Sequence, residues 1–328
     1  MKTTNINTKF LGLDIPSPIL SGSCGIASKV SNLVALEKAG AGAVILKSLF
    51  EEQIICDIER NTGYISHSQY GESYDYVSHH VAGFETEKHF NLIKDAKKSL
   101  SIPVIGSINC VSFNNWIVYA QRMQDAGCDA LELNFMILPC NVETSAEDIE
   151  RLFNETIFAL KRSISIPILI KVGKYFTDMS KFMHKLSWCG INGITMFSKN
   201  IDFDIDTKEE KLTNTSFLTP PQSLYETLRW TSLLSAKLRC EISASSGIYT
   251  GDDVVKALLA GAQTTQVVST LYENGLVRIT EMNNYLKNWM EEKEYSSIED
   301  FRGKMAVKKG DSSSFVRTQF MKYFAEIQ

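Results

Sequence analysis

Short apolar runs alternate with helical stripes along most of this chain. Within the runs the apolar positions are continuous, which is typical of strands buried on both faces of a parallel sheet. Between them, apolar residues recur three and four positions apart, which indicates amphipathic helices. We expect roughly eight strands, over Pro18 to Ser21, Gly42 to Leu46, Pro103 to Ile108, Ala130 to Leu133, Pro167 to Val172, Gly193 to Phe197, Glu241 to Ser245 and Thr264 to Val268.

The stretch from Arg239 to Gly275 shows the repeating unit most completely. It begins with a predicted strand and continues into a helix that Thr250 is expected to cap, with Asp253 three positions on to complete a capping box. Gly261 is expected to end that helix in a left-handed conformation. A second strand then follows, so the segment is one strand, helix, strand unit.

Repeated units of this kind in a chain of 328 residues favour a single (β/α)8 TIM barrel, and an open doubly wound sheet is the alternative. Residues 1–300 are expected to form the barrel. Residues 301–328 are expected to form a helical C-terminal extension that packs on the barrel or on the partner in a homodimer. Long polar intervals follow the second strand, from Phe50 to Gly83, and the sixth, from Lys199 to Pro221, and predict substrate loops or lids.

Charge and cysteine usage limit the kinds of partner and site that we expect of this chain. The net charge is −4 with both signs interspersed, so we expect neither nucleic acid nor an anionic membrane as a partner. We expect a small molecule instead. The seven cysteines include no Cys-x-x-Cys pair, which favours reduced thiols and predicts no metal site. The N-terminus is polar and no apolar run reaches membrane-spanning length, so we expect a cytoplasmic protein.

The last two predicted strands end in small hydroxyl-bearing residues. Ser246 and Gly247 follow the seventh strand, and Ser269 and Thr270 follow the eighth. A glycine there permits a tight turn and lets backbone amides approach a ligand. In barrels of this kind the loops after strands seven and eight are a frequent phosphate site, which is what these two ends predict.

The other strand ends bring lysines and asparagines to the same mouth. Lysines end strands two and five, and asparagines end strands three and four. Each lysine alone is as readily explained as the first solvated residue after a buried strand. Together with the phosphate site, however, they suit an anionic, phosphate-bearing cofactor. The residues are Lys47, Asn109, Asn134 and Lys171.

Five of these segments, in this order, resemble the dihydroorotate dehydrogenases. They are Ala43 to Ser48, Leu131 to Asn134, Ile170 to Val172, Ser245 to Ile248 and Val268 to Thr270. The resemblance covers nearly the whole chain. It implies an FMN-binding barrel that passes a hydride from dihydroorotate, or a related dihydropyrimidine-like ring, to the flavin, as in pyrimidine biosynthesis.

The resemblance also implies roles for individual residues. The flavin ring and ribityl chain would be lined by Ser23, Lys47, Ser48, Asn109, Asn134 and Lys171. The phosphate would be held by Ser246, Gly247, Ser269 and Thr270. The substrate would contact Lys47, Asn134 and Ser198.

The substrate side departs from the family pattern. Cytosolic members carry Asn-x-x-Cys-Pro-Asn after the fourth strand, where the cysteine takes the proton. Here Asn134 is followed by Phe-Met-Ile-Leu-Pro-Cys-Asn, which places Ile137 at the position of the base. Cys140 is the candidate catalytic base if the loop is rebuilt, and an ordinary loop thiol is the alternative.

Further substrate contacts of the family have no match. The asparagine-rich loop expected between strands two and three is absent from His67 to Gly71, and Phe197 occupies the position of an asparagine after strand six. Three functions therefore remain open. They are an FMN oxidoreductase, a degenerate FMN-binding protein with altered or lost turnover, and a Schiff-base lyase that uses Lys47 or Lys171.

Overall fold

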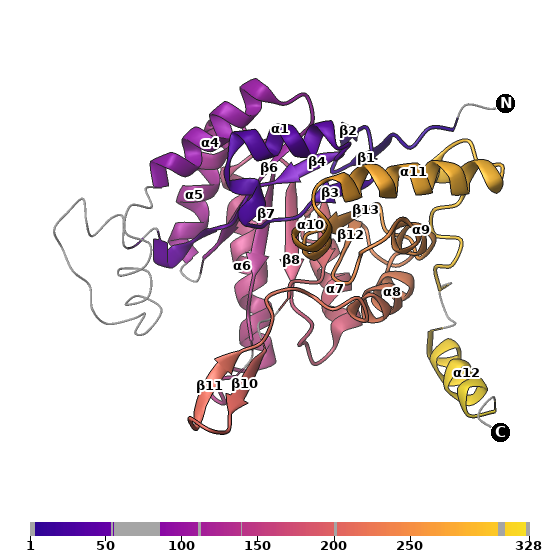
Figure 1. Cartoon of the computed structure of the whole chain (residues 1–328). Helices are drawn as coiled ribbons and strands as arrows, with labels where there is room; N and C mark the ends of the chain where they lie inside the picture. The colour runs from indigo at the N-terminus through magenta and orange to yellow at the C-terminus, as the bar shows by residue number, and fades with distance from the viewer. Residues whose placement is uncertain are drawn as a thin grey trace.

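The computed structural model describes residues 4–53, 55, 86–110, 113–138, 140–199, 202–307 and 312–325. Figure 1 shows parallel strands at the centre of the molecule with helices around them. Among the described helices, none is long and apolar enough to cross a membrane.

Eight parallel strands of the described chain close into a barrel. Seven follow the chain order from β4 round to β13, and pairing of β13 with β3 and of β3 with β4 completes the circle. This confirms the TIM-barrel prediction over the open sheet. The barrel strands are β3 (Ile19–Ser21), β4 (Ala43–Ile45), β6 (Val104–Asn109), β7 (Ala130–Phe135), β8 (Ile168–Val172), β9 (Gly193–Met196), β12 (Glu241–Ser245) and β13 (Thr264–Val267).

Helices follow the strands and cover the outside of the barrel (Figure 1). They bury apolar stripes, as Val254, Val255 and Leu258 do in α9. The capping box of Thr250 and Asp253 is present, and Gly261 has a φ of 106° as predicted. The helices are α1 (Val30–Lys38), α4 (Thr86–Ser99), α5 (Phe113–Asp125), α6 (Ala146–Ser163), α7 (Met179–Ser187), α8 (Ser223–Leu234), α9 (Gly251–Leu259), α10 (Ser269–Asn274) and α11 (Val277–Glu292), with short 3-10 turns at η1 (Gly25–Ser28) and η2 (Ile298–Asp300).

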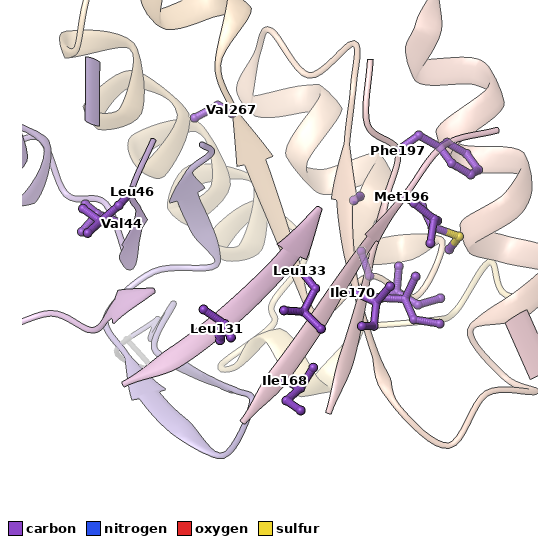
Figure 2. Close-up of a cluster of buried hydrophobic side chains, with 14 of the residues drawn as sticks. Val44, Leu46, Leu131, Leu133, Ile168, Ile170, Met196, Phe197 and Val267 are labelled. Carbon is purple, nitrogen blue, oxygen red and sulfur yellow. The ribbon is translucent and has the colours of Figure 1, made fainter. Parts of the chain in front are cut away.

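The apolar side chains of the strands belong to two separate clusters. The larger one lies between strands and helices and includes Leu131, Leu133 and Ile170, which are shown in Figure 2. The smaller one contains strand residues such as Ala130 and Leu169 but no helix residue, so it fills the barrel interior. The alternation of the two clusters along β7 and β8 therefore identifies every second residue as interior.

A hairpin that we did not predict closes the amino-terminal end of the barrel. It consists of β1 (Thr8–Phe10) and β2 (Leu13–Ile15), and its residues Phe10 and Leu11 belong to the interior cluster. Its strands are only three residues long, too short for a clear alternating pattern. Apolar side chains thus close the amino-terminal end of the barrel, so we expect the functional site at the carboxyl ends of the strands.

The two long intervals have different outcomes. The interval from Lys199 to Pro221 carries a two-stranded hairpin, β10 (Phe203–Asp206) and β11 (Lys211–Asn214), which projects from the barrel in Figure 1. The interval from Phe50 to Gly83 begins at β5 (Leu49–Phe50) and then lies largely outside the described residues.

The predicted C-terminal extension contains α12 (Ser312–Ala325). Before it, the backbone amides of Gly303 and Met305 donate to carbonyls at the end of α9, and Phe301 is fully buried. The division at residue 300 and the packing of α12 on a partner subunit stay predictions.

Candidate functional site

A cavity of about 490 Å³ opens at the carboxyl ends of the barrel strands. Its wall is built by segments that follow β3, β4, β7, β8, β9, β12 and β13, which is the face where barrels of this type carry their sites. Most of the residues predicted for the site meet here. Those in the wall are Ser23, Lys47, Ser48, Asn134, Lys171, Ser198, Ser246, Gly247 and Ser269.

Two further predicted residues support the wall from behind. Asn109 is buried at the end of β6, and its Nδ2 donates to the backbone oxygen of Asn134 at 2.8 Å. Thr270 is fully buried, and its hydroxyl donates to the Tyr249 carbonyl at 3.2 Å. Both position neighbours that line the cavity.

The ends of β12 and β13 form a rigid, donor-rich corner. The Thr227 hydroxyl donates to the Ser245 carbonyl at 2.9 Å, which ties the turn to α8. Ser269 begins α10, so its amide and the next one have no acceptor within the helix. Its Oγ accepts from the Thr219 amide at 2.8 Å, and its hydroxyl is also hydrogen-bonded to the Tyr249 side chain.

Gly247 is required here for a reason that the sequence did not show. Its φ is 76°, and a Cβ atom would lie 2.2 Å from the Leu224 amide nitrogen and 2.8 Å from the Pro221 carbonyl oxygen. The missing side chain therefore makes room for the start of α8. Our expectation concerned the approach of a ligand to the turn; the close neighbour is the protein's own backbone.

A chain of three hydroxyl groups lies beside this corner, after β3 and β4 and within β6. Ser48 Oγ is 3.0 Å from Ser23 Oγ and 2.8 Å from Ser107 Oγ, and the Ser48 amide donates to Ser23 at 2.9 Å. Nearby, a Cβ on Gly22 would lie 2.7 Å from Val268 Cγ2. The small-residue turn after β3 thus packs closely against the end of β13.

Beneath Lys171 lies a buried polar network that the sequence analysis missed. Lys171 Nζ lies 3.6 Å from Glu132 Oε1, and Glu132 is fully buried in β7. The other carboxylate oxygen accepts from the Thr195 hydroxyl at 3.1 Å and from Gln266 Nε2 at 2.9 Å. The available signal was a polar residue at every second, interior position of otherwise apolar strands.

Lys47 has a buried histidine beside it. His89 lies on α4 and is 6% exposed, and its Nε2 has no hydrogen-bond partner among the described residues. Burial lowers the pKa of His89 from 6.5 to about 4, and the nearby Lys47 ammonium acts in the same direction. His89 is therefore neutral at pH 7, and the positive charge on this side belongs to Lys47.

One thiol reaches the cavity wall. Burial raises the pKa of Cys24, although backbone hydrogen bonds from Ala27 and Ile26 and a bond to Tyr272 oppose this effect. The thiol is therefore protonated at pH 7. Within the described part of the chain, no group of three His, Cys, Asp or Glu side chains could hold a metal ion.

The loop after β7 presents an apolar surface. Met136 lines the cavity, and Ile137 is half-buried. Cys140 is exposed and does not line the part of the cavity that the structure describes. Phe197 and Phe217 continue the apolar surface, and Phe217 meets Tyr272 edge to face at 5.4 Å. Residues 67–71, where the asparagine-rich loop of the family has no clear match, lie outside the described residues.

No protein-family model matches the chain. Several individual proteins are similar to it over most of its length. The chain is 25% identical to the catalytic subunit of dihydroorotate dehydrogenase B (NAD(+)) of Thermoplasma acidophilum, over 91% of this chain and 98% of that protein. Its identity to the same subunit from Pyrococcus furiosus is 26%, with the same coverage. The NAD-dependent dihydropyrimidine dehydrogenase subunit PreA of Escherichia coli is 22% identical, over 92% of this chain and 77% of that subunit.

Proposed function

We propose that this chain, a divergent relative of the dihydroorotate dehydrogenases, is an FMN-dependent oxidoreductase that acts on a CH–CH bond of a dihydropyrimidine-like ring. The observation that carries the proposal is the cavity at the barrel mouth. Its wall offers backbone amides and serine hydroxyls after β12 and β13, together with two lysines, Lys47 after β4 and Lys171 on β8.

The size of the cavity and the donors in its wall support a bound FMN. A volume of about 490 Å³ is within the roughly 300–1,000 Å³ typical of small-molecule sites. Ser269 and the first amides of α10 suit a phosphate. Asn134 Oδ1 is buried without a partner among the described residues, and an N–H or O–H of the ligand would satisfy it.

When bound, FMN would supply the hydride acceptor. Lys171 would stand where negative charge develops on reduction and stabilise it, since a fixed cation in a water-poor site acts strongly on such a charge. Lys47 would orient the anionic or electron-rich end of the substrate. Phe197 and Met136 would exclude water from the reacting atoms.

The first experiment is to purify the protein and identify its chromophore. We expect a yellow protein that releases FMN on denaturation. A colourless protein that also fails to take up added FMN would overturn the proposal. The second experiment adds dihydroorotate and dihydrouracil separately under anaerobic conditions, and we expect one of them to bleach the flavin.

A changed or lost substrate is the second candidate, and the loop after β7 favours it. Where relatives are expected to carry a proton acceptor, this cavity presents Met136 and the half-buried Ile137. If the ring still loses a proton, a different group must accept it. Flavin that stays oxidised with both dihydropyrimidines would support this candidate over the first.

A Schiff-base lyase is less well supported. A lysine must attack a carbonyl as a free amine, whereas Lys171 is held in an ion pair with Glu132 at 3.6 Å. Lys47 remains the alternative nucleophile. Borohydride trapping of a carbonyl substrate on Lys47, in protein without flavin, would revive this function.

A further inference from the structure

We infer that Glu132 is a positioning residue that holds Lys171 as a fixed ammonium at the floor of the cavity and sets how strongly its charge acts on the bound ring. The inference rests on the proposed function. Glu132 is two positions beyond the interior residue Ala130 on β7, so it lies inside the barrel directly below the mouth.

The carboxylate is itself held on one side only. Thr195 and Gln266 both donate to Glu132 Oε2, and Gln266 Nε2 also donates to Thr195 Oγ1 at 2.9 Å. An ionised carboxylate only accepts, so these donors fix its orientation. The second oxygen, Glu132 Oε1, has no hydrogen bond among the described residues and is turned toward Lys171.

The spacing between the charges decides what the pair can do. At 3.6 Å, Lys171 Nζ and Glu132 Oε1 form an ion pair that is longer than a hydrogen bond. Lys171 is 8% exposed and lines the cavity, whereas Glu132 has no exposed surface and is not in the wall. The ammonium can therefore bond to a ligand while the carboxylate behind it reduces its net charge.

This arrangement predicts an effect on the reduction potential of the bound flavin. Removing the negative charge in Glu132→Gln leaves the Lys171 ammonium uncompensated, so the reduced, more negative flavin is stabilised. We expect the equilibrium to shift toward reduced flavin about tenfold, which is about 30 mV for a two-electron couple. The measurement is anaerobic titration against a reference dye.

The control is the same substitution in a Lys171→Met background. Without the ammonium, Glu132→Gln no longer frees a positive charge beside the flavin. We expect Glu132→Gln to shift the equilibrium less than about twofold in that background. An equal shift in both backgrounds, or no shift with Lys171 present, would overturn the inference.

The apoprotein provides a readout that does not require flavin. Removing one member of a buried pair leaves the other uncompensated, so each single variant should melt at a lower temperature. The double variant Glu132→Gln/Lys171→Met should melt above the Glu132→Gln protein. Melting temperatures that fall additively would show that the two side chains are not coupled.

A conservative variant covers the case in which Glu132→Gln does not fold. Glu132→Asp keeps the charge but withdraws the carboxylate from Lys171 by one methylene. We expect a shift in the same direction but smaller, about threefold, and an unchanged potential would contradict the inference. If the unmodified protein binds no FMN, the proposed function fails, while the melting comparison still tests the pair.

Discussion

The two sides of the cavity are built by different means. At the ends of β12 and β13, the turn at Ser246 and Gly247 and the start of α10 present backbone groups held by neighbouring backbone and hydroxyl groups. On the side of β4 and β7, side chains such as Lys47 and Met136 form the wall. Backbone donors survive many substitutions, whereas one substitution changes a side-chain contact completely. The departure from the family pattern that the sequence predicts at Ile137 lies in the loop after β7, on this second side.

The largest expected effect is on the backbone side. Gly247→Ala would combine a left-handed residue with a clash against the Leu224 amide, and each defect costs about 1–3 kcal/mol. We expect the free energy of unfolding to fall by about 3 kcal/mol or more, measured by denaturant titration.

The matched control is Gly12→Ala. Gly12 has a φ of 81° and no neighbour within 4 Å of its Cβ position. It should lose only the backbone cost, about 1–2 kcal/mol. Equal losses at the two glycines would show that the contact with α8 is unimportant.

The next effect concerns the histidine behind Lys47. Because the pKa of His89 is about 4 in the folded chain and 6.5 is its ordinary value, the unfolded chain binds the proton first as the pH falls. Stability is therefore present above pH 6.5 and is lost progressively toward pH 4. We expect a loss of about 2 kcal/mol between pH 7 and pH 5 that His89→Phe abolishes.

The control for this prediction is His184→Gln, since His184 is exposed on α7. It should keep the loss of stability between pH 7 and pH 5 that His89→Phe abolishes. If His89→Phe and the unmodified protein lose stability in parallel over this range, His89 is not buried in its neutral form.

A smaller effect is expected at the phosphate corner. Ser269→Ala removes a hydroxyl of the cavity wall from which a bound phosphate would accept, and a hydrogen bond to a charged group contributes about 1.5–3 kcal/mol. The dissociation constant of FMN should rise about tenfold, measured by quenching of flavin fluorescence.

Ser246→Ala serves as the comparison, because the Ser246 hydroxyl already donates to the Phe197 carbonyl at 3.1 Å. It should change FMN affinity much less than Ser269→Ala. The reverse order would place the phosphate nearer to the turn after β12.

The smallest expected effect is at Cys140. General-base catalysis contributes about 10²–10⁴-fold, but Cys140 is exposed and lies outside the described wall of the cavity. Cys140→Ser should therefore change flavin reduction by less than about twofold with whichever dihydropyrimidine is active. A loss of a hundredfold would show that the loop after β7 brings the thiol to the substrate.

The strands of the barrel could be predicted well, because most of them combine an apolar run with a helix stop or proline that marks the beginning. β12 spans the predicted Glu241 to Ser245, and the other seven differ by only one or two residues at an end. The hairpin of β1 and β2 was missed because its strands carry too little pattern. It is stabilised by contacts across the barrel, such as the Glu241 carboxylate accepting from the Leu11 amide at 2.6 Å.

The sequence by itself determined the barrel, the face that carries the cavity and nine of the residues that line it, because strand periodicity and order along the chain are local properties. Only the tertiary structure decided what lies beneath and behind them. Glu132 meets Lys171 from the next strand, Thr195 and Gln266 join from two others, and Gly247 meets α8. Contacts between distant segments depend on how the strands close on one another, and no spacing along a single chain records that.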